Sequence, residues 1–133
     1  MKAIVRGLAL AVSAAPSIVL ACGACIEDKV ASTYDHTVVT AAVARHQQIL
    51  FVAVDGPIDA ARVIKRIETA VPRVSGALTG TLRTSVSPPA FSFALDDSRS
   101  PAAVLSRIRR EVDDPALRMS IVRIMRNGVL REP

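Results

Sequence analysis

The sequence predicts an α+β domain whose elements alternate as βαββαβ, preceded by a helical arm. Three observations support this fold class. Half of the 133 residues are hydrophobic and 22% are charged, a balance typical of a packed core. Apolar residues recur with a helical period in some segments and alternate with a period of two in others. Pro, Gly and Asp separate these segments. A chain of this length is expected to form one domain.

The first 21 residues have the pattern of a secretory signal peptide. Lys2 and Arg6 precede an apolar run over 7–21, which is shorter than the ~20 residues of a membrane-spanning helix and is interrupted by Pro16. We therefore expect export to the bacterial periplasm or outer surface. A membrane anchor or a buried helix is the alternative interpretation. Removal of these residues lowers the formal net charge from +5 to +3, so the mature chain is only mildly basic.

Residues 22–46 are predicted to form a helical arm. The apolar side chains at helical spacing are Ile26, Val30, Tyr34, Val38 and Ala41. They predict one helix that continues to Arg45. Glu27 and Asp28 are expected in its first turn, where carboxylates favour the positive end of the helix dipole.

The domain itself is expected over 47–128, and its first half is predicted to be strand, helix and strand. Residues 49–54 form a continuous apolar run, which is typical of a buried strand. Asp55-Gly56-Pro57 then predicts a turn into a helix over 58–71, and Pro72 helps to end that helix. Alternating positions over 78–86 predict the second strand.

The second half is predicted to repeat strand, helix and strand. Phe91, Phe93 and Leu95 are expected to form the buried face of the third strand. Ser100 and Pro101 predict a capped helix start. The apolar stripe of that helix consists of Val104, Leu105, Ile108 and Val112.

The last strand is expected over Met119–Met125 and ends at Asn127-Gly128, with 129–133 as a tail. The resulting order, βαββαβ, predicts two helices on one face of an antiparallel four-stranded sheet, which is the ferredoxin-like arrangement.

The strongest chemical signal is Cys22-Gly23-Ala24-Cys25 at the head of the arm. Two thiols at this spacing can bind a soft metal ion, copper(I) or zinc, or they can form a disulfide. A helix that follows them favours the thiolate on which either chemistry depends. Because the chain has no further cysteine, metal binding, redox exchange and a structural disulfide between Cys22 and Cys25 all stay open.

Cys22 is also a candidate lipidation site. Val19-Leu20-Ala21-Cys22 is similar to a bacterial lipobox, with Leu at its second position. Cleavage before Cys22 would make it the first mature residue, and cleavage after Ala24 is the alternative. We expect a membrane as partner only if Cys22 is lipidated.

Both histidines lie downstream, in the spacing Cys-x2-Cys-x10-His-x9-His. Cysteine and histidine together suit copper(I) or zinc. One helix cannot easily direct His36 and His46 at the same ion, so His36 is the candidate third metal ligand. Ordinary surface histidines are the alternative interpretation of both.

No catalytic residue is predicted. The sequence lacks a Gly-rich phosphate loop, a His-Glu-x-x-His motif and a Gly-x-Ser-x-Gly nucleophile elbow. Hydrolase and transferase activities therefore have no support, and whether the protein is an enzyme stays open.

Basic side chains of the two domain helices are candidates for a common outer face. They are Arg62, Lys65, Arg66, Arg107, Arg109 and Arg110. A solvated helix surface is one interpretation, and binding of an acidic partner or an anionic membrane is the other. High salt would weaken such an association.

The predicted topology with a Cys-x-x-Cys motif resembles heavy-metal-associated domains, the small copper and zinc carriers of bacteria. The resemblance covers the topology of 47–126. That family holds its cysteines in the loop after the first strand, whereas here that loop is Val54-Asp55-Gly56-Pro57 and the cysteines lie some thirty residues earlier. The resemblance implies metal transfer to a partner protein.

Two further resemblances concern shorter motifs. Residues 49–52 look like the first-strand motif of RNA-recognition domains, and 90–94 loosely resemble their third-strand motif, in which exposed aromatics stack on bases. Pro89 and Ala90 replace the expected basic residue and glycine, so Phe91 and Phe93 are predicted to be core and no nucleic acid is expected as partner. The spacing of Cys22 and Cys25 is also similar to that of thioredoxin-like oxidoreductases.

The leading hypothesis is an exported carrier or sensor of copper(I) or zinc that uses Cys22, Cys25 and His36, with another metal or redox protein as its partner. Thiol–disulfide exchange by the same cysteines is the enzymatic alternative. A lipid-anchored interaction domain without chemistry of its own is the third.

Overall fold

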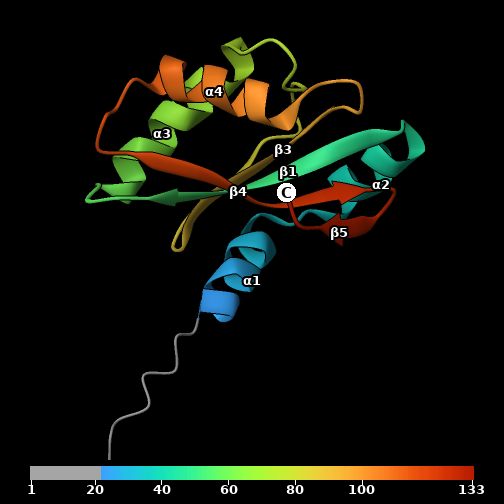
Figure 1. Ribbon diagram of the computed structural model, residues 1–133, viewed down its shortest axis with the longest axis horizontal. Helices are drawn as coiled ribbons and strands as arrows, with labels where there is room; N and C mark the ends of the chain where they lie inside the picture. Colours follow the sequence, from blue (N-terminus) through green and yellow to red (C-terminus); the bar gives the residue numbers. More distant parts are fainter. Residues whose placement is uncertain (1–21) are drawn as a thin grey trace, which may run out of the picture.

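One antiparallel sheet organises the computed structural model, which describes the backbone of residues 22–133 and the side chains of 26–133 (Figure 1). The predicted signal peptide lies outside these residues. The helices are α1 (Cys22–Thr33), α2 (His36–Ala44), α3 (Ala60–Ala70) and α4 (Pro101–Val112), with a 3-10 turn η1 (Val71–Arg73). The strands are β1 (Gln47–Asp55), β2 (Arg83–Val86), β3 (Pro89–Asp96), β4 (Arg118–Arg126) and β5 (Val129–Arg131).

The five strands lie in the order β2-β3-β1-β4-β5. The α+β class is confirmed, and the arrangement is compatible with a ferredoxin-like fold. Within residues 22–133, no helix combines the length and the apolar character needed to cross a membrane.

Strand β1 is the centre of the sheet and is buried on both faces. Residues 48–54 are all buried, as expected for the apolar run that begins at Ile49. Because successive side chains of a strand alternate between faces, the two sides of β1 contribute to different cores. Leu50, Val52 and Val54 pack under α3 and α4, while Ile49 and Phe51 pack under the arm.

The α3–α4 face of the sheet holds the larger core. Phe91 and Phe93, predicted to be core, are fully buried and stack with ring centroids 6.0 Å apart. Ser100 caps α4 by accepting a hydrogen bond from the Ala103 amide, as its sequence position predicted. The predicted apolar stripe of α4 is buried, which confirms that assignment; it consists of Val104, Leu105, Ile108 and Val112.

The arm covers the opposite face of the sheet with two helices instead of the one that was predicted (Figure 1). The chain leaves the helical path at Tyr34 and Asp35, and Asp35 caps the new helix α2 through its side chain. Helix α1 already begins at Cys22, so Glu27 and Asp28 lie beyond its first turn, contrary to expectation. The second core beneath the arm contains Val30, Val39, Ala42, Ile49, Phe51, Ala94 and Met125.

Two strand boundaries also differ from the prediction. The second strand was expected over 78–86, but β2 begins only at Arg83, because Gly80 adopts a positive φ of 84° that interrupts extended pairing. At the other end, Asn127 and Gly128 adopt φ values of 51° and 74°. Positive φ at both residues is typical of a two-residue hairpin turn, so the expected tail pairs with β4 as β5.

Gln48 is a fully buried polar side chain at the start of β1. Its Nε2 donates to the carbonyl oxygens of Asp96 (3.2 Å) and Arg99 (2.9 Å). Its Oε1 accepts from Nε (3.2 Å) and Nη2 (2.9 Å) of Arg126. Both the nitrogen and the oxygen of this amide therefore form hydrogen bonds, as burial of a polar group requires.

Gly56, in the turn from β1 to α3, is expected to tolerate no side chain. Its φ is +129°, and a Cβ there would lie 2.4 Å from the carbonyl oxygen of Ala116. Gly80 is a matched control, because it has a φ of +84° but nothing within 4 Å. We expect Gly80→Ala to cost about 1–2 kcal/mol from backbone strain alone, and Gly56→Ala to cost more. Equal urea-unfolding free energies for the two variants would contradict this close approach.

Candidate functional site on the amino-terminal arm

The Cys22-Gly23-Ala24-Cys25 motif forms the first described turn of α1 and does not precede the helix. Positions separated by three residues are neighbours on a helix surface. The helix N-terminus carries partial positive charge, which favours a thiolate there. The backbone therefore presents the two cysteines in an arrangement suited to a shared ligand or a mutual bond, while the thiols themselves lie outside the described side chains.

Helix α1 is held on the sheet by apolar and polar contacts. Val30 is buried in the arm core. At the end of α1, Ser92 Oγ of β3 donates to the Thr33 carbonyl oxygen at 2.8 Å, and both residues are buried. Lys29 Nζ lies 2.9 Å from Asp55 Oδ1 at the end of β1. These contacts fix the orientation of α1 relative to the strands.

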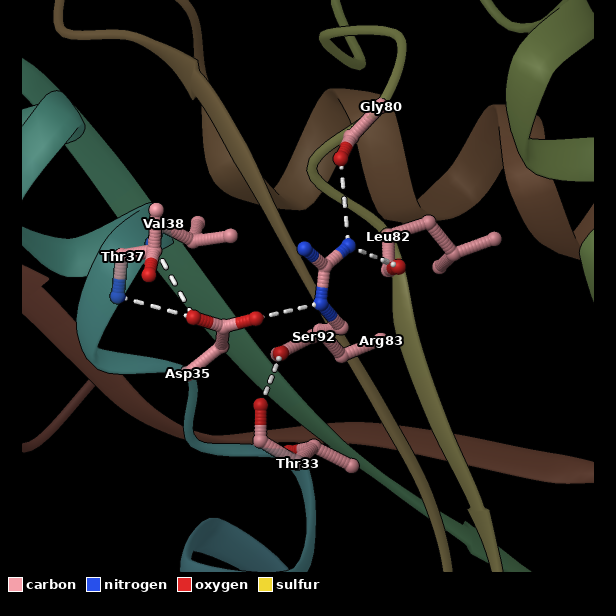
Figure 2. Close-up of polar contacts among 8 residues, drawn as sticks. All are labelled: Thr33, Asp35, Thr37, Val38, Gly80, Leu82, Arg83 and Ser92. Carbon is pink, nitrogen blue, oxygen red and sulfur yellow. Dashed lines mark hydrogen bonds and ion pairs between the residues drawn. The ribbon is translucent and has the colours of Figure 1, made fainter.

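Asp35 connects the arm to the edge of the sheet (Figure 2). Its Oδ1 accepts hydrogen bonds from the amides of Thr37 (2.8 Å) and Val38 (3.3 Å), and its Oδ2 accepts one from Arg83 Nε at 2.7 Å. The hydrogen bond from Arg83, together with the two amides, lowers the pKa of the Asp35 carboxyl below its ordinary value.

Arg83 is itself held in place by backbone carbonyl groups. Its Nη1 donates to the carbonyl oxygens of Gly80 (3.1 Å) and Leu82 (2.8 Å), while its Nε faces Asp35 (Figure 2). The loop before β2 therefore orients the guanidinium toward the arm. This pair joins residues 48 positions apart in the sequence.

The structure places the two histidines away from the cysteine motif. His36 is the first residue of α2 and is exposed, and His46 follows α2 with a φ of 53° and is also exposed. Cys25 lies near one end of α1, and His36 lies beyond the other, with an axial rise of about 12 Å from Cys25 to Thr33. Among the residues that the structure describes, no group of three or more His, Cys, Asp or Glu side chains is placed to hold a metal ion.

The loop after β1 and the three phenylalanines, on which the resemblances to heavy-metal-associated and RNA-recognition domains depend, have structural roles in this fold. The loop after β1 contains Asp59, which caps α3 by accepting from the Arg62 amide, and it contains no cysteine. Phe51 lies beneath the arm, and Phe91 and Phe93 lie beneath α3 and α4. All three rings are buried, so none is available for base stacking on the sheet surface.

Asp35 and Arg83 were not among the site residues predicted from the sequence. A local signal for Asp35 exists, because Asp before a helical run is a frequent N-cap. No local signal identifies Arg83 as its partner, since that contact depends on how the arm folds over the sheet.

The comparisons with known proteins identify no relative. No protein family, curated protein or solved structure was found to match this chain.

The Asp35–Arg83 pair predicts an acid-sensitive contribution to stability. Because the folded-state pKa of Asp35 is lowered, its contribution is fully present above the ordinary value of 3.8 and is lost as the pH falls through the lowered value. Asn can still cap a helix but has no charge, so Asp35→Asn should lose less stability than the wild type between about pH 7 and pH 3.

The measurement is the urea midpoint of unfolding at both pH values. Asp28→Asn is the matched control, because Asp28 is exposed and its side chain forms no hydrogen bond or ion pair with another described residue. The urea midpoint of this control should decrease with pH by the same amount as that of the wild type. Wild-type-like acid sensitivity in Asp35→Asn would show that the ion pair does not carry this effect.

Proposed function

We propose that this chain is a small exported metal-binding protein with a ferredoxin-like βαββαβ core, in which Cys22 and Cys25 bind copper(I) or zinc. It acts as a carrier or sensor and exchanges the metal with another metal or redox protein. The observation that carries the proposal is the position of the only two cysteines, one helical turn apart at the start of a helix that is docked on the sheet.

Copper(I) is the first expectation for the metal. Thiolates are soft ligands and select copper(I) or zinc over harder ions. A structural zinc site takes four protein ligands, and the chain contains only two cysteines. Two thiolates suffice for copper(I), so zinc would require further ligands from elsewhere.

His36 is the less favoured third ligand once the fold is considered, because it follows the opposite end of α1. If cleavage makes Cys22 the first residue, its amine is nearer to the thiols along the chain. Lipidation of Cys22 would leave Cys25 without its partner thiol and would favour the alternative of a membrane-anchored interaction domain.

Intact mass of the exported protein distinguishes these alternatives. A metal that is present under native conditions and lost on denaturation supports the carrier proposal. An acyl group on Cys22 identifies a lipoprotein. A bare chain lighter by two hydrogens identifies a disulfide, and the redox or structural alternatives then replace metal binding.

Cys25→Ser should weaken copper(I) binding by about 100-fold or more, because even removal of a group that only supports a metal ligand costs about 10–100-fold. Competition against a chromophoric copper(I) chelator measures the change. The variant should keep its fold, since the described core begins at Val30.

His36→Ala is the matched control in the same assay. We expect its affinity to remain within about twofold of the wild type, because an exposed side chain beyond the far end of α1 is poorly placed to share the ion. Unchanged affinity of Cys25→Ser would overturn the proposed site, and a large loss in His36→Ala would restore His36 as a ligand.

A further inference from the structure

A groove crosses the outer surface of the two domain helices, on the opposite side of the sheet from the arm. Figure 1 shows α3 and α4 together on one side of the strands and α1 on the other. The central part of the groove is a hollow of about 630 Å³ between α3 and the end of α4. This volume lies within the range of small-ligand sites.

Four basic side chains along one helix face line the central hollow, together with the carboxylates of Asp59 and Glu111. Arg62, Lys65, Arg66 and Arg73 follow one another at intervals that place them along the same side of α3 and η1. Arg66 forms an ion pair with Asp114 at 3.2 Å.

Two cations of the hollow have no such partner. Arg73 pairs with Glu111 at 3.6 Å, but among the described residues no carboxylate lies within ion-pair distance of Arg62 or Lys65. Both side chains are exposed. Their charges are therefore available to a ligand, and guanidinium groups suit carboxylates through paired hydrogen bonds.

The groove continues past both ends of this hollow. Toward the start of α3, a smaller hollow of about 200 Å³ shares Arg62 and Arg66 with the central one. Toward η1, another of about 320 Å³ shares Arg73 and adds Arg107 and Arg110. Five of the six basic residues predicted to gather on this surface line the groove, whereas Arg109 donates to the Met119 carbonyl oxygen and lies outside it.

The shape and floor of the groove define the class of ligand. From Asp59 to Arg73 the helical path rises about 21 Å, and an extended chain advances about 3.3 Å per residue, so about six extended residues fit. The floor is apolar, because Ala70 and Val112 are buried beneath the basic rim. A ligand that fills it needs carboxylates for the rim and small apolar groups for the floor.

We propose that the α3–α4 groove binds an extended acidic segment of a partner protein in which carboxylate and small apolar side chains alternate. Polyphosphate offers the charge but no apolar group for the floor. An anionic membrane surface fits poorly because the groove is concave. Its two helices, α3 and α4, also lie on the opposite side of the strands from α1, which begins at the predicted lipidation site. The proposal does not depend on metal binding.

The test uses a fluorescein-labelled octapeptide of alternating Glu and Val, with binding to the purified protein measured by fluorescence anisotropy. Arg62→Glu/Lys65→Glu should weaken binding by about tenfold or more, because both unpaired charges are reversed. Arg45→Glu/Arg131→Glu is the matched control. It changes the net charge equally at exposed residues outside the groove and should change affinity less than about twofold.

Three results would overturn the proposal. Absence of peptide binding at low salt is the first. An equal loss in both double variants is the second, because it would indicate general charge attraction. Equal competition by octaglutamate, polyphosphate or anionic vesicles is the third. It would show that the apolar floor does not contribute to ligand recognition and that another class of ligand occupies the surface.

Discussion

The structure depends on a central strand that is apolar on both faces. Strand β1 is buried from Gln48 to Val54, and burial of both faces requires two covering layers. Helices α3 and α4 supply one layer, and the amino-terminal arm supplies the other. Without the arm, Ile49 and Phe51 would face water. The arm is therefore part of the packed domain, and the segment that carries the cysteines has a defined position relative to the sheet.

Much of the fold could be predicted because its signals are local. The continuous apolar run of β1, the Ser100-Pro101 helix start and the stripe of α4 each lie within a few residues of sequence. The break between α1 and α2 could not be predicted from periodicity, because Val38 and Ala41 continue the helical spacing across it. Asp35 is held by Arg83 from β2, a contact that only tertiary structure creates.

The candidate site was predicted in part and for the same reason. The cysteine spacing is a local pattern, and the backbone places it within one helical turn. His36 was assigned as a ligand on the assumption of one continuous helix, whereas the structure places it at the start of α2, after the break that follows Thr33. The basic side chains were identified as a possible surface from helical periodicity, but their arrangement into a groove depends on the packing of α3 against α4.

Gln48 resolves an ambiguity that the apolar strand creates. Most strands distinguish an inner from an outer face, so a shift by one residue exposes the wrong side chains and is excluded. A strand that is apolar on both sides lacks this safeguard, and a shifted alignment would still bury hydrophobic groups. The buried amide has partners at only one alignment, where it meets the Asp96 and Arg99 carbonyl groups and the Arg126 guanidinium. A single polar residue thus specifies the strand register, which the hydrophobic pattern alone leaves undetermined.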